Sequence, residues 1–347
     1  METKLNLDQA FERYLPVIEN ELRRPFEASP AMLQLFYGMM GYHLGWVDES
    51  LSPAQPKVGK RLRPLLCMLV CRAVGGDALD ALPAAAALEL IHNFSLVHDD
   101  IQDNSPVRRH RRTVWTIWGR PQAINVGDGL FAMAFLNLAR LKSNLPPSRV
   151  RAVYESCARA CLLLCEGQYM DMSFESRLEV NEEEYLQMIL RKTAALLSCA
   201  SYVGVVIGSD NVDVALKYQT FGEQLGLAFQ IQDDILGIWG DPKVTGKPSA
   251  DDILQCKKTL PVLFALRREA ELGGNALGNL YSRGAVPPEE VPAVLAILDE
   301  LGALEYARRL NGVYCDKALW QLAESGSGTA DCVILEELVE RLRERPS

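Results

Sequence analysis

Two groups of aspartates have the residue types and spacing of a divalent-metal site. The first lies in the segment HDDIQD and consists of Asp99, Asp100 and Asp103. On a helix, residues i and i+4 project from one face, so Asp99 and Asp103 would form a pair of carboxylates. Such a pair is self-repelling and opposes the dipole of a helix C-terminus, so a compensating cation is expected. Carboxylates completed by water and phosphate oxygens suit Mg²⁺.

The second group consists of Asp233 and Asp234 in the segment FQIQDDILG, with Asp241 further along. The position four residues after Asp233 is Gly237, so this group is the weaker one as an isolated ligand pair. Either group alone is also compatible with a solvated acidic helix end. Two such groups, each beside a glutamine and near the end of an apolar helical stretch, favour several divalent ions around one polyanion.

Basic residues accompany the acidic groups and would meet a polyanion directly. The turn GKRLRP begins a helix at residues 59–64, and a helix N-terminus favours anions. The run RRHRR at residues 108–112 follows the first acidic group and suits bidentate binding of oxyanions. Taken singly, each cation is also compatible with a solvated surface position. Further candidates are Lys192, Lys247, Lys257 and Lys258.

Composition limits the possible partners. The chain has 36 Lys and Arg against 45 Asp and Glu, and the net charge of −9 disfavours nonspecific binding to nucleic acid or an anionic membrane. The same net charge would also disfavour an anionic substrate. It is, however, an average over acidic groups that would bind metal ions and basic groups that would bind phosphate, so it does not exclude one. The N-terminal segment lacks the apolar core of a signal peptide, and no unbroken apolar run reaches about 18 residues, so no transmembrane segment is expected.

The nine cysteines form no CxxC pair, and we expect buried free thiols in a reducing, cytoplasmic setting. Cys157, Cys161 and Cys165 recur every four residues and would share one helix face. A metal site is one interpretation of that face. The leucines at 162–164 favour the other interpretation, which is a core position.

The elements that must position these residues are helices. Helical periodicity is present almost throughout, alternating strand patterns are scarce, and no stretch resembles a flexible interdomain linker. We therefore expect one large all-α domain over residues 1–347, with a single core. The charged loops 104–120 and 239–258 each follow an aspartate-containing helix. Helices are expected at 5–24, 30–46, 61–75, 82–103, 122–142, 147–172, 181–208, 211–238, 257–273, 287–311 and 329–344.

In their order and spacing, the motifs resemble those of the trans-isoprenyl diphosphate synthases. They are GKRLRP, LIHNFSLVHDDIQD followed by RR, RKT, FQIQDDILG, GK and KKTLP, and they span residues 59–261. No single motif is specific, but the ordered set is, and the flanks are helical and of suitable length. The resemblance implies a single large helical bundle around a deep central cavity, the isoprenoid synthase fold, assembled as a homodimer.

The resemblance also implies the reaction. Isopentenyl diphosphate would be joined head to tail to an allylic diphosphate (dimethylallyl, geranyl or farnesyl), with release of pyrophosphate. The allylic C–O bond breaks to give a carbocation, and Mg²⁺ with Lys and Arg groups stabilises the leaving diphosphate. The alkene then attacks, and pyrophosphate accepts the proton that is lost. An apolar cavity keeps water from the cation.

Site residues follow from the resemblance motif by motif. The expected metal-site residues are Asp99, Asp100, Asp103, Asp233 and Asp234. Asp99 and Asp103 would hold two Mg²⁺ ions and Asp233 a third, about three in all, with Asp100 and Asp234 nearby. The residues expected to contact the allylic diphosphate are Arg108, Lys192, Thr193, Gln230, Lys247 and Lys257. Those expected to bind the diphosphate of isopentenyl diphosphate are Lys60, Arg63, His92 and Arg109. Among these residues, the catalytic set is Asp99, Asp103, Arg108, Lys192, Asp233 and Lys247.

His92 lies seven residues before Asp99, two helical turns away on nearly the same face, although a satisfied core histidine is the alternative. The growing chain would be limited by Phe94 and Ser95, about one turn before Asp99. Relatives with short products often carry aromatic residues at both positions, whereas here only Phe94 is aromatic. This pattern resembles archaeal-type geranylgeranyl diphosphate synthases, so geranylgeranyl diphosphate is expected as main product and farnesyl diphosphate next.

The chain departs from the family pattern twice. Gly237 stands where many members have a third aspartate, and the basic run 110–112 replaces a Gly and a Pro-Thr pair. Two other functions share some of these features. A class I terpene cyclase has an aspartate-rich motif and the helical fold, but it needs no second diphosphate site of the kind that GKRLRP, His92 and Arg109 indicate. A non-catalytic partner subunit is the third alternative.

Overall fold

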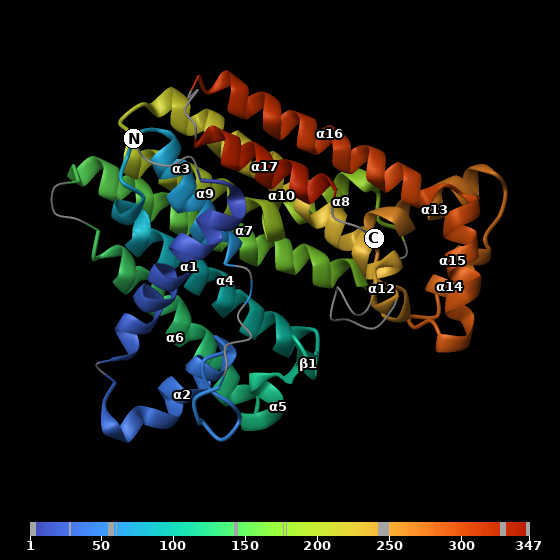
Figure 1. Cartoon of the computed structure of the whole chain (residues 1–347). Helices are drawn as coiled ribbons and strands as arrows, with labels where there is room; N and C mark the ends of the chain where they lie inside the picture. The colour runs from blue at the N-terminus through green and yellow to red at the C-terminus, as the bar shows by residue number, and fades with distance from the viewer. Residues whose placement is uncertain are drawn as a thin grey trace. The chain divides into compact units, whose positions relative to one another are not determined.

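The computed structural model describes residues 5–27, 29–54, 59, 61–141, 145–175, 177, 179–241, 250–326 and 331–344. These residues are almost entirely helical, which confirms the expected all-α class (Figure 1). The exception is a small antiparallel ribbon of β1 (Val107–Arg108) and β2 (Arg111–Arg112). The long helices are α1 (Leu7–Arg23), α2 (Gln34–His43), α3 (Leu62–Ala73), α4 (Leu82–Gln102), α6 (Arg120–Leu138), α7 (Pro147–Glu175), α9 (Ala195–Gly208), α10 (Val212–Trp239), α13 (Leu260–Glu271), α15 (Val291–Glu300), α16 (Ala303–Glu324) and α17 (Cys332–Arg343).

Shorter elements connect these helices. They are the turns η1 (Arg24–Phe26), η2 (Ala31–Leu33), η3 (Ala78–Ala81) and η5 (Pro288–Glu290), the helices α5 (Val114–Trp118), α8 (Glu182–Ile189), α12 (Asp251–Leu254) and α14 (Ala276–Tyr281), and the π-helical segment η4 (Leu190–Ala194).

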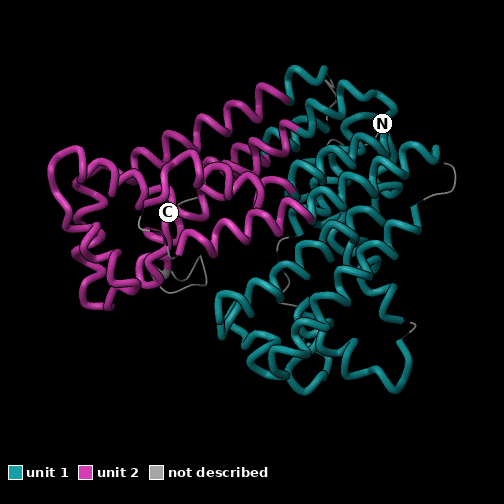
Figure 2. Tube along the Cα trace, turned by 180° about the vertical axis from the view of Figure 1, so that it is seen from behind, with its two compact units in different colours: residues 1–161, 196–219, 322–337 teal, residues 162–195, 220–321, 338–347 magenta. Residues whose placement is uncertain are grey.

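The chain divides into two compact units (Figure 2). Unit 1 consists of residues 1–161, 196–219 and 322–337, and it carries the first aspartate motif. Unit 2 consists of residues 162–195, 220–321 and 338–347, and it carries the second. A single domain over residues 1–347 therefore stays a prediction.

The core of unit 1 surrounds α4. This helix packs most extensively against α6 and also against α3 and α1. Its run of alanines at 84–87 is fully buried, because small side chains let neighbouring helices approach closely. Helix α9 approaches α3 in the same way: a Cβ atom on Gly204 would lie 2.5 Å from the carbonyl oxygen of Cys67. Close helix packing thus fixes the direction of α4, which ends in the first aspartate motif.

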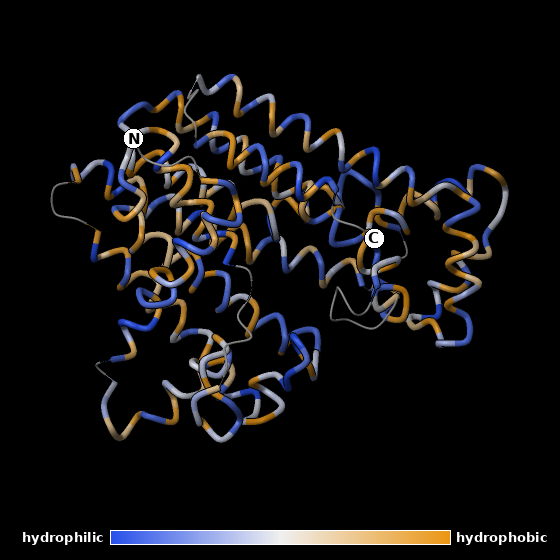
Figure 3. Tube along the Cα trace, in the orientation of Figure 1, coloured by the Kyte–Doolittle hydropathy of each residue, from blue (hydrophilic) through white to orange (hydrophobic). Residues whose placement is uncertain are grey.

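The core of unit 2 joins the end of α10 to α12, α13, α14 and α15. Ile238, Val262, Leu277 and Leu298 are all buried in one cluster. Hydrophobic and hydrophilic stretches alternate along the individual helices, as amphipathic helices require (Figure 3).

Two expected helices have different boundaries. The helix expected at 287–311 is in fact the pair α15 and α16, because Gly302 adopts φ +75° and ends the first of them. Helix α16 then runs on to Glu324, where no helix was expected. The helix expected at 122–142 begins at Arg120 and is preceded by α5, from which Gly119 at φ +83° separates it. Neither α14 nor the ribbon was expected.

All nine cysteines are free, and seven of them are buried, as expected. Cys157 and Cys161 are buried whereas Cys165 is exposed, so the three do not share one environment. Among the described residues, no group of three or more His, Cys, Asp or Glu side chains is placed to hold a metal ion, so the metal interpretation of this face lacks support. One stretch in the described ranges, Glu182–Gly208, is long and apolar enough to cross a membrane, and 78% of its most apolar window is buried in the protein.

Candidate active site

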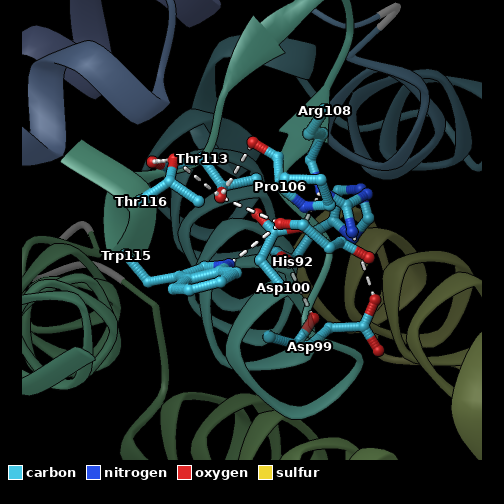
Figure 4. Close-up of polar contacts among 10 residues, drawn as sticks. His92, Asp99, Asp100, Pro106, Arg108, Thr113, Trp115 and Thr116 are labelled. Carbon is cyan, nitrogen blue, oxygen red and sulfur yellow. Dashed lines mark hydrogen bonds and ion pairs between the residues drawn. The ribbon is translucent and has the colours of Figure 1, made fainter. Parts of the chain in front are cut away.

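The first aspartate motif lies at the C-terminal end of α4 (Figure 4). The helix ends at Gln102, and the backbone N–H of Asp103 still donates to the carbonyl oxygen of Asp99 at 2.8 Å. Asp99 and Asp103 therefore lie one turn apart, as the spacing predicts, and both are partly exposed. Asp100 points inward and is only 2% exposed. Two partly exposed carboxylates one turn apart are a ligand type that suits a hard divalent cation such as Mg²⁺.

Arg108 of β1 contacts two of these aspartates. Its Nε atom donates to Asp100 Oδ1 at 2.7 Å, and its Nη2 atom donates to Asp99 Oδ2 at 3.2 Å (Figure 4). Burial raises the pKa of Asp100 to about 6, although the Arg108 guanidinium opposes the shift. Asp100 is thus buried and paired with Arg108, and its expected place among the metal-site residues stays a prediction.

Hydrogen bonds within the loop after α4 hold Arg108 beside the first aspartate motif. The backbone N–H of Ser105 donates to the carbonyl oxygen of Asp100 at 3.0 Å. The Thr113 hydroxyl and the Trp115 indole N–H both donate to the carbonyl oxygen of Ser105 at 2.9 Å (Figure 4). Because this loop is tied at both ends, Arg108 is held in place before any ligand binds.

A pocket beside the ribbon carries an excess of positive charge. Arg109 lines it, and no carboxylate in the described part of the chain lies within ion-pair distance of the Arg109 guanidinium. Desolvation of that guanidinium lowers the pKa of Arg109, and Arg108 contributes to the shift. A Cβ atom on Gly59 would lie 2.8 Å from Arg109 Nη2, so the first glycine of GKRLRP leaves room for this side chain. The pocket is lined by Tyr42, His43, Asp100, Arg108, Arg109, Arg111, Arg112, Thr113 and Val114.

The GKRLRP turn is anchored by a residue that the motif analysis did not single out. Arg61 is 2% exposed and adopts φ +46° immediately before α3. Its guanidinium pairs with Glu19 of α1 and Glu89 of α4, each at 2.7 Å. Glu89 is the one acidic residue in the otherwise apolar run AAAALELI. An acid in such a run is the local signal that could have identified Glu89 as the buried partner of a cation. Arg63 is partly buried in the first turn of α3, and Lys60 lies outside the described residues.

His92 of α4 is partly buried and is kept neutral by its surroundings. Burial lowers its pKa well below the usual range, and the guanidinium groups of Arg63 and Arg109 lower it further. A neutral imidazole in a cationic region has one N–H group to donate to an anion. The position predicted from the helical spacing is therefore consistent with the expected binding role.

Histidine burial predicts a pH dependence of stability. The unfolded chain takes up a proton on His92 below about pH 6.5, whereas the folded chain does not. As the pH falls below that value, the free energy of unfolding should therefore fall by up to about 1.4 kcal/mol per pH unit for each such histidine. His92→Gln should remove one histidine's share of this slope between pH 7 and pH 5 in urea denaturation without metal. His110→Gln, which changes an exposed histidine to the same residue, is the control for the substitution itself. An unchanged slope in His92→Gln would show that His92 is protonated in the folded chain.

The second aspartate motif lies within α10. Asp234 is 4% exposed and its carboxylate accepts three hydrogen bonds, from the Tyr185 hydroxyl, the Leu260 backbone N–H at 3.1 Å and Gln230 Nε2 at 3.0 Å. Burial raises the pKa of Asp234 to about 7, although the bond from Tyr185 opposes the shift. The neighbouring Asp233 is partly exposed. Asp233 is therefore the member of this pair whose exposure suits a metal ligand.

The RKT motif lies on the π-helical segment η4. Helices of this type are rare in proteins overall, and where they occur they are frequently at functional sites. Lys192 pairs with Asp171 of α7, which the sequence analysis missed, and the Thr193 hydroxyl donates to Gln230 Oε1 at 2.6 Å. The structure thus brings Thr193, Gln230 and Asp234 into one hydrogen-bonded series. Lys257 is exposed, and Lys247 lies outside the described residues.

Two glycines leave room for this segment. A Cβ atom on Gly167 of α7 would lie 2.7 Å from the Cα atom of Lys192, and one on Gly226 of α10 would lie 2.6 Å from the Cβ atom of Ala194. Contacts this short force the backbone to move. The position of Lys192 and Thr193 therefore depends on both glycines.

The structure also explains the first departure from the family pattern. A Cβ atom on Gly237 would lie 2.7 Å from Cγ of Asp252, a buried residue of α12. An aspartate at position 237 would need the space that Asp252 occupies. A side chain at position 237 would therefore require the Asp252 carboxylate to move.

Phe94, the expected limit to chain length, is 7% exposed. Its ring packs edge to face against Phe131 of α6, with centroids 5.1 Å apart, and against His98 at 5.9 Å. The neighbouring Ser95 hydroxyl donates to the carbonyl oxygen of His92 at 2.8 Å. Phe94 is therefore held rigidly, with a second aromatic ring behind it.

Comparison with known proteins identifies similar sequences and structures. The model of the polyprenyl synthetase family matches residues 45–298. Geranylgeranyl diphosphate synthase of Mycobacterium tuberculosis is 38% identical over 303 residues, covering 87% of this chain and 85% of the relative. (2E,6E)-farnesyl diphosphate synthase of Mycobacterium bovis is 40% identical over 235 residues, covering 68% and 64%. The crystal structure of geranylgeranyl pyrophosphate synthetase from Pyrococcus horikoshii superposes with a TM-score of 0.86 at 33% identity and covers 98% of this chain and 99% of that one.

Proposed function

Because the chain belongs to the polyprenyl synthetase family, whose members extend prenyl chains, we propose that it makes geranylgeranyl diphosphate as its main product. The family membership and the prenyltransferase activity agree with the resemblance of the motifs. Isopentenyl diphosphate is added head to tail to an allylic diphosphate. The observation that carries the condensation of two diphosphates is the cationic pocket at Arg109 beside an aspartate motif, and the similarity to geranylgeranyl diphosphate synthases supports the C20 product.

The aspartates divide into ligands and residues that orient them. Asp99 and Asp103 of the first motif and Asp233 of the second are the proposed Mg²⁺ ligands, for about three ions in total. Their partial exposure supports this role, whereas Asp100 and Asp234 are buried. When bound, Mg²⁺ neutralises charge on the leaving diphosphate.

The cations divide between the two substrates. The proposed contacts to the allylic diphosphate are Arg108, Lys192, Thr193, Gln230, Lys247 and Lys257. Those to isopentenyl diphosphate are Lys60, Arg63, His92 and Arg109. Arg109 supports this division because it has no carboxylate partner in the described ranges, whereas Arg108 lies against the aspartates. Each fixed donor to the allylic diphosphate stabilises the charge that develops on this leaving group, and losing one costs about 3–4 kcal/mol of barrier in comparable sites. The donors to isopentenyl diphosphate bind and orient a diphosphate that stays in the product.

The chain needs no general-base side chain for this reaction. After the C–O bond breaks, the alkene of isopentenyl diphosphate attacks the allylic cation and the released pyrophosphate takes the proton. The chain binds and orients both diphosphates and shields the cation from water. Its neutral His92 donates a hydrogen bond and does not serve as the base.

Incubation of the purified chain with Mg²⁺, labelled isopentenyl diphosphate and each allylic primer tests this proposal. A labelled C20 diphosphate is the expected product. Release of pyrophosphate without incorporation of the label would indicate a terpene cyclase. Turnover only after a second chain is added would indicate a partner subunit, and a C15 product would assign the chain to farnesyl diphosphate synthesis.

Replacing Phe94 with alanine should shift the product toward longer chains, because the ring is removed from the expected end of the substrate cavity. Phe135→Ala is the matched control, since Phe135 also packs against Phe131, at 5.0 Å, but not against Phe94. Chromatography of the dephosphorylated products measures the effect. Phe94→Ala should also lose roughly 3–5 kcal/mol of stability, so both variants are assayed below their unfolding temperatures. Identical products from Phe94→Ala and wild type would remove Phe94 from this role.

A homodimer is the proposed assembly. Helix α7 supports it with exposed apolar side chains on one stripe of unit 2, namely Leu162, Tyr169 and Met172, at 60%, 75% and 41% exposure. Stripes of this kind are typical of protein interfaces. Light scattering should give twice the 38.5 kDa chain mass, and Tyr169→Asp should shift the mass toward that of one chain. A wild-type monomer would contradict the proposal.

A further inference from the structure

His43, the last residue of α2, is held beside the cationic pocket by its two chain neighbours. The Tyr42 hydroxyl donates to the carbonyl oxygen of Arg112 at 2.8 Å, and Arg111 Nη1 donates to the carbonyl oxygen of Tyr42 at 3.1 Å. On the other side, Arg61 Nη2 donates to the carbonyl oxygen of Leu44 at 3.3 Å. The backbone of His43 is thus fixed between the ribbon and the GKRLRP turn.

The His43 side chain lines the same pocket as Arg109. Its Nε2 atom is buried, and no described residue forms a hydrogen bond with it. A buried polar atom of this kind normally has a hydrogen-bond partner, so the lack of a partner for Nε2 needs an explanation. The charges that act on the imidazole are those of Arg109, Arg108, Arg61 and Arg111, and a guanidinium group has no acceptor to offer.

The pocket also contains one carboxylate, that of Asp100, but this group already accepts a hydrogen bond from Arg108. Burial lowers the pKa of His43 well below its usual range, and the nearby Arg109 guanidinium lowers it further. The neutral imidazole therefore has one N–H group to donate. What the pocket lacks is an anionic acceptor that both His43 and Arg109 can contact.

We infer that His43 is an additional substrate-binding residue, whose Nε2–H donates to a phosphate oxygen of the isopentenyl diphosphate that Arg109 holds. This inference rests on the proposed function and adds a residue to it. Arg108 and Arg109 both line the pocket, but Arg108 is paired with Asp99 and Asp100 whereas no described carboxylate pairs with Arg109. Isopentenyl diphosphate is therefore favoured over the allylic substrate as the ligand that His43 shares with Arg109.

Titration calorimetry of isopentenyl diphosphate into the metal-free chain tests the inference directly. His43→Phe keeps a ring of similar size but has no donor, so its Kd should rise roughly 10- to 100-fold. His43→Gln keeps an N–H donor near the same place and should recover most of the affinity. In the assay with Mg²⁺, His43→Phe should raise the KM for isopentenyl diphosphate and leave the KM for the allylic primer within about twofold.

A structural role for His43 would give a different pattern. Loss of an orphaned polar atom should leave the ligand-free His43→Phe chain at least as thermally stable as wild type, whereas a core histidine with a needed bond would make it less stable. Wild-type affinity in His43→Phe, together with lost binding in Arg109→Gln, would overturn the inference and leave the proposed function standing. No binding or incorporation by the wild-type chain would overturn both.

Nuclear magnetic resonance of ¹⁵N-labelled histidine answers the same question if His43→Phe does not fold. The Nε2 resonance of His43 in the wild-type chain should shift when isopentenyl diphosphate is added and should not shift with an equal concentration of chloride. A resonance that does not move at saturating isopentenyl diphosphate would overturn the inference.

Discussion

Asp233→Asn is expected to lower kcat by roughly 100- to 1,000-fold and to change the free energy of unfolding by less than about 1 kcal/mol. The substitution removes a charge from a partly exposed carboxylate that we propose as an Mg²⁺ ligand. The Mg²⁺ concentration that gives half-maximal rate should therefore rise as well. Steady-state assays over a series of Mg²⁺ concentrations, with urea denaturation of the metal-free chain, measure both quantities.

The adjacent residue provides the matched comparison. Asp234→Asn places an amide group opposite the three donors that now meet a carboxylate, the Tyr185 hydroxyl, the Leu260 N–H and Gln230 Nε2. Its free energy of unfolding should fall by on the order of 1–3 kcal/mol. A stable Asp234→Asn chain together with a destabilised Asp233→Asn chain would contradict the assignment of one residue to the metal and the other to packing.

Gly167→Ala is expected to lower kcat/KM for the allylic primer by on the order of 100-fold, because displacement of reacting groups by about 1 Å has effects of this size. The added methyl group would lie 2.7 Å from the Cα atom of Lys192, so η4 must move. Overpacking should also remove roughly 1–3 kcal/mol of stability. Kinetics with a series of primer concentrations and urea denaturation measure the two effects.

Gly204→Ala is the control that separates the loss of stability from the loss of activity. A Cβ atom at this position also meets backbone, 2.5 Å from the carbonyl oxygen of Cys67, but the residue packs on α3 in unit 1 and not on η4. It should lose stability while its KM for the primer stays near that of wild type. Gly312→Ala, where a Cβ atom meets nothing within 4 Å, should gain up to about 1 kcal/mol. If Gly167→Ala and Gly204→Ala lose stability equally and have equal kinetics, the close contact at Gly167 does not position Lys192 and Thr193 for the allylic primer.

The helices around the first motif could be predicted because their signals are local. The run from Leu82 to Gln102 is rich in Ala and Leu and free of internal breaks, and it is α4 in the structure. The break at Gly302 was missed because the helical pattern continues on both sides of it, and only the backbone angle of +75° shows that a glycine ends the helix. Boundaries of this kind depend on one dihedral angle rather than on periodicity.

Residues that act through distant partners could not be predicted. Arg61 meets Glu19 and Glu89, which lie 42 residues before and 28 residues after it in the sequence. His43 has no motif around it, and its relevance comes from the pocket that it shares with Arg109. A short motif records which residues are near one another in the chain, whereas these contacts are made between helices.

The sequence by itself determined the helical class, the two aspartate motifs with their accompanying cations, and the family, because each depends on residue type and spacing along the chain. The tertiary structure supplied the physical difference between the members of each aspartate pair, which the resemblance had separated by motif position alone. Asp100 and Asp234 are buried and accept hydrogen bonds from Arg108, Tyr185 and Leu260 of other elements, while Asp99 and Asp233 stay partly exposed. Burial and hydrogen bonding are properties of packing between elements, and adjacent identical residues differ only after that packing has formed.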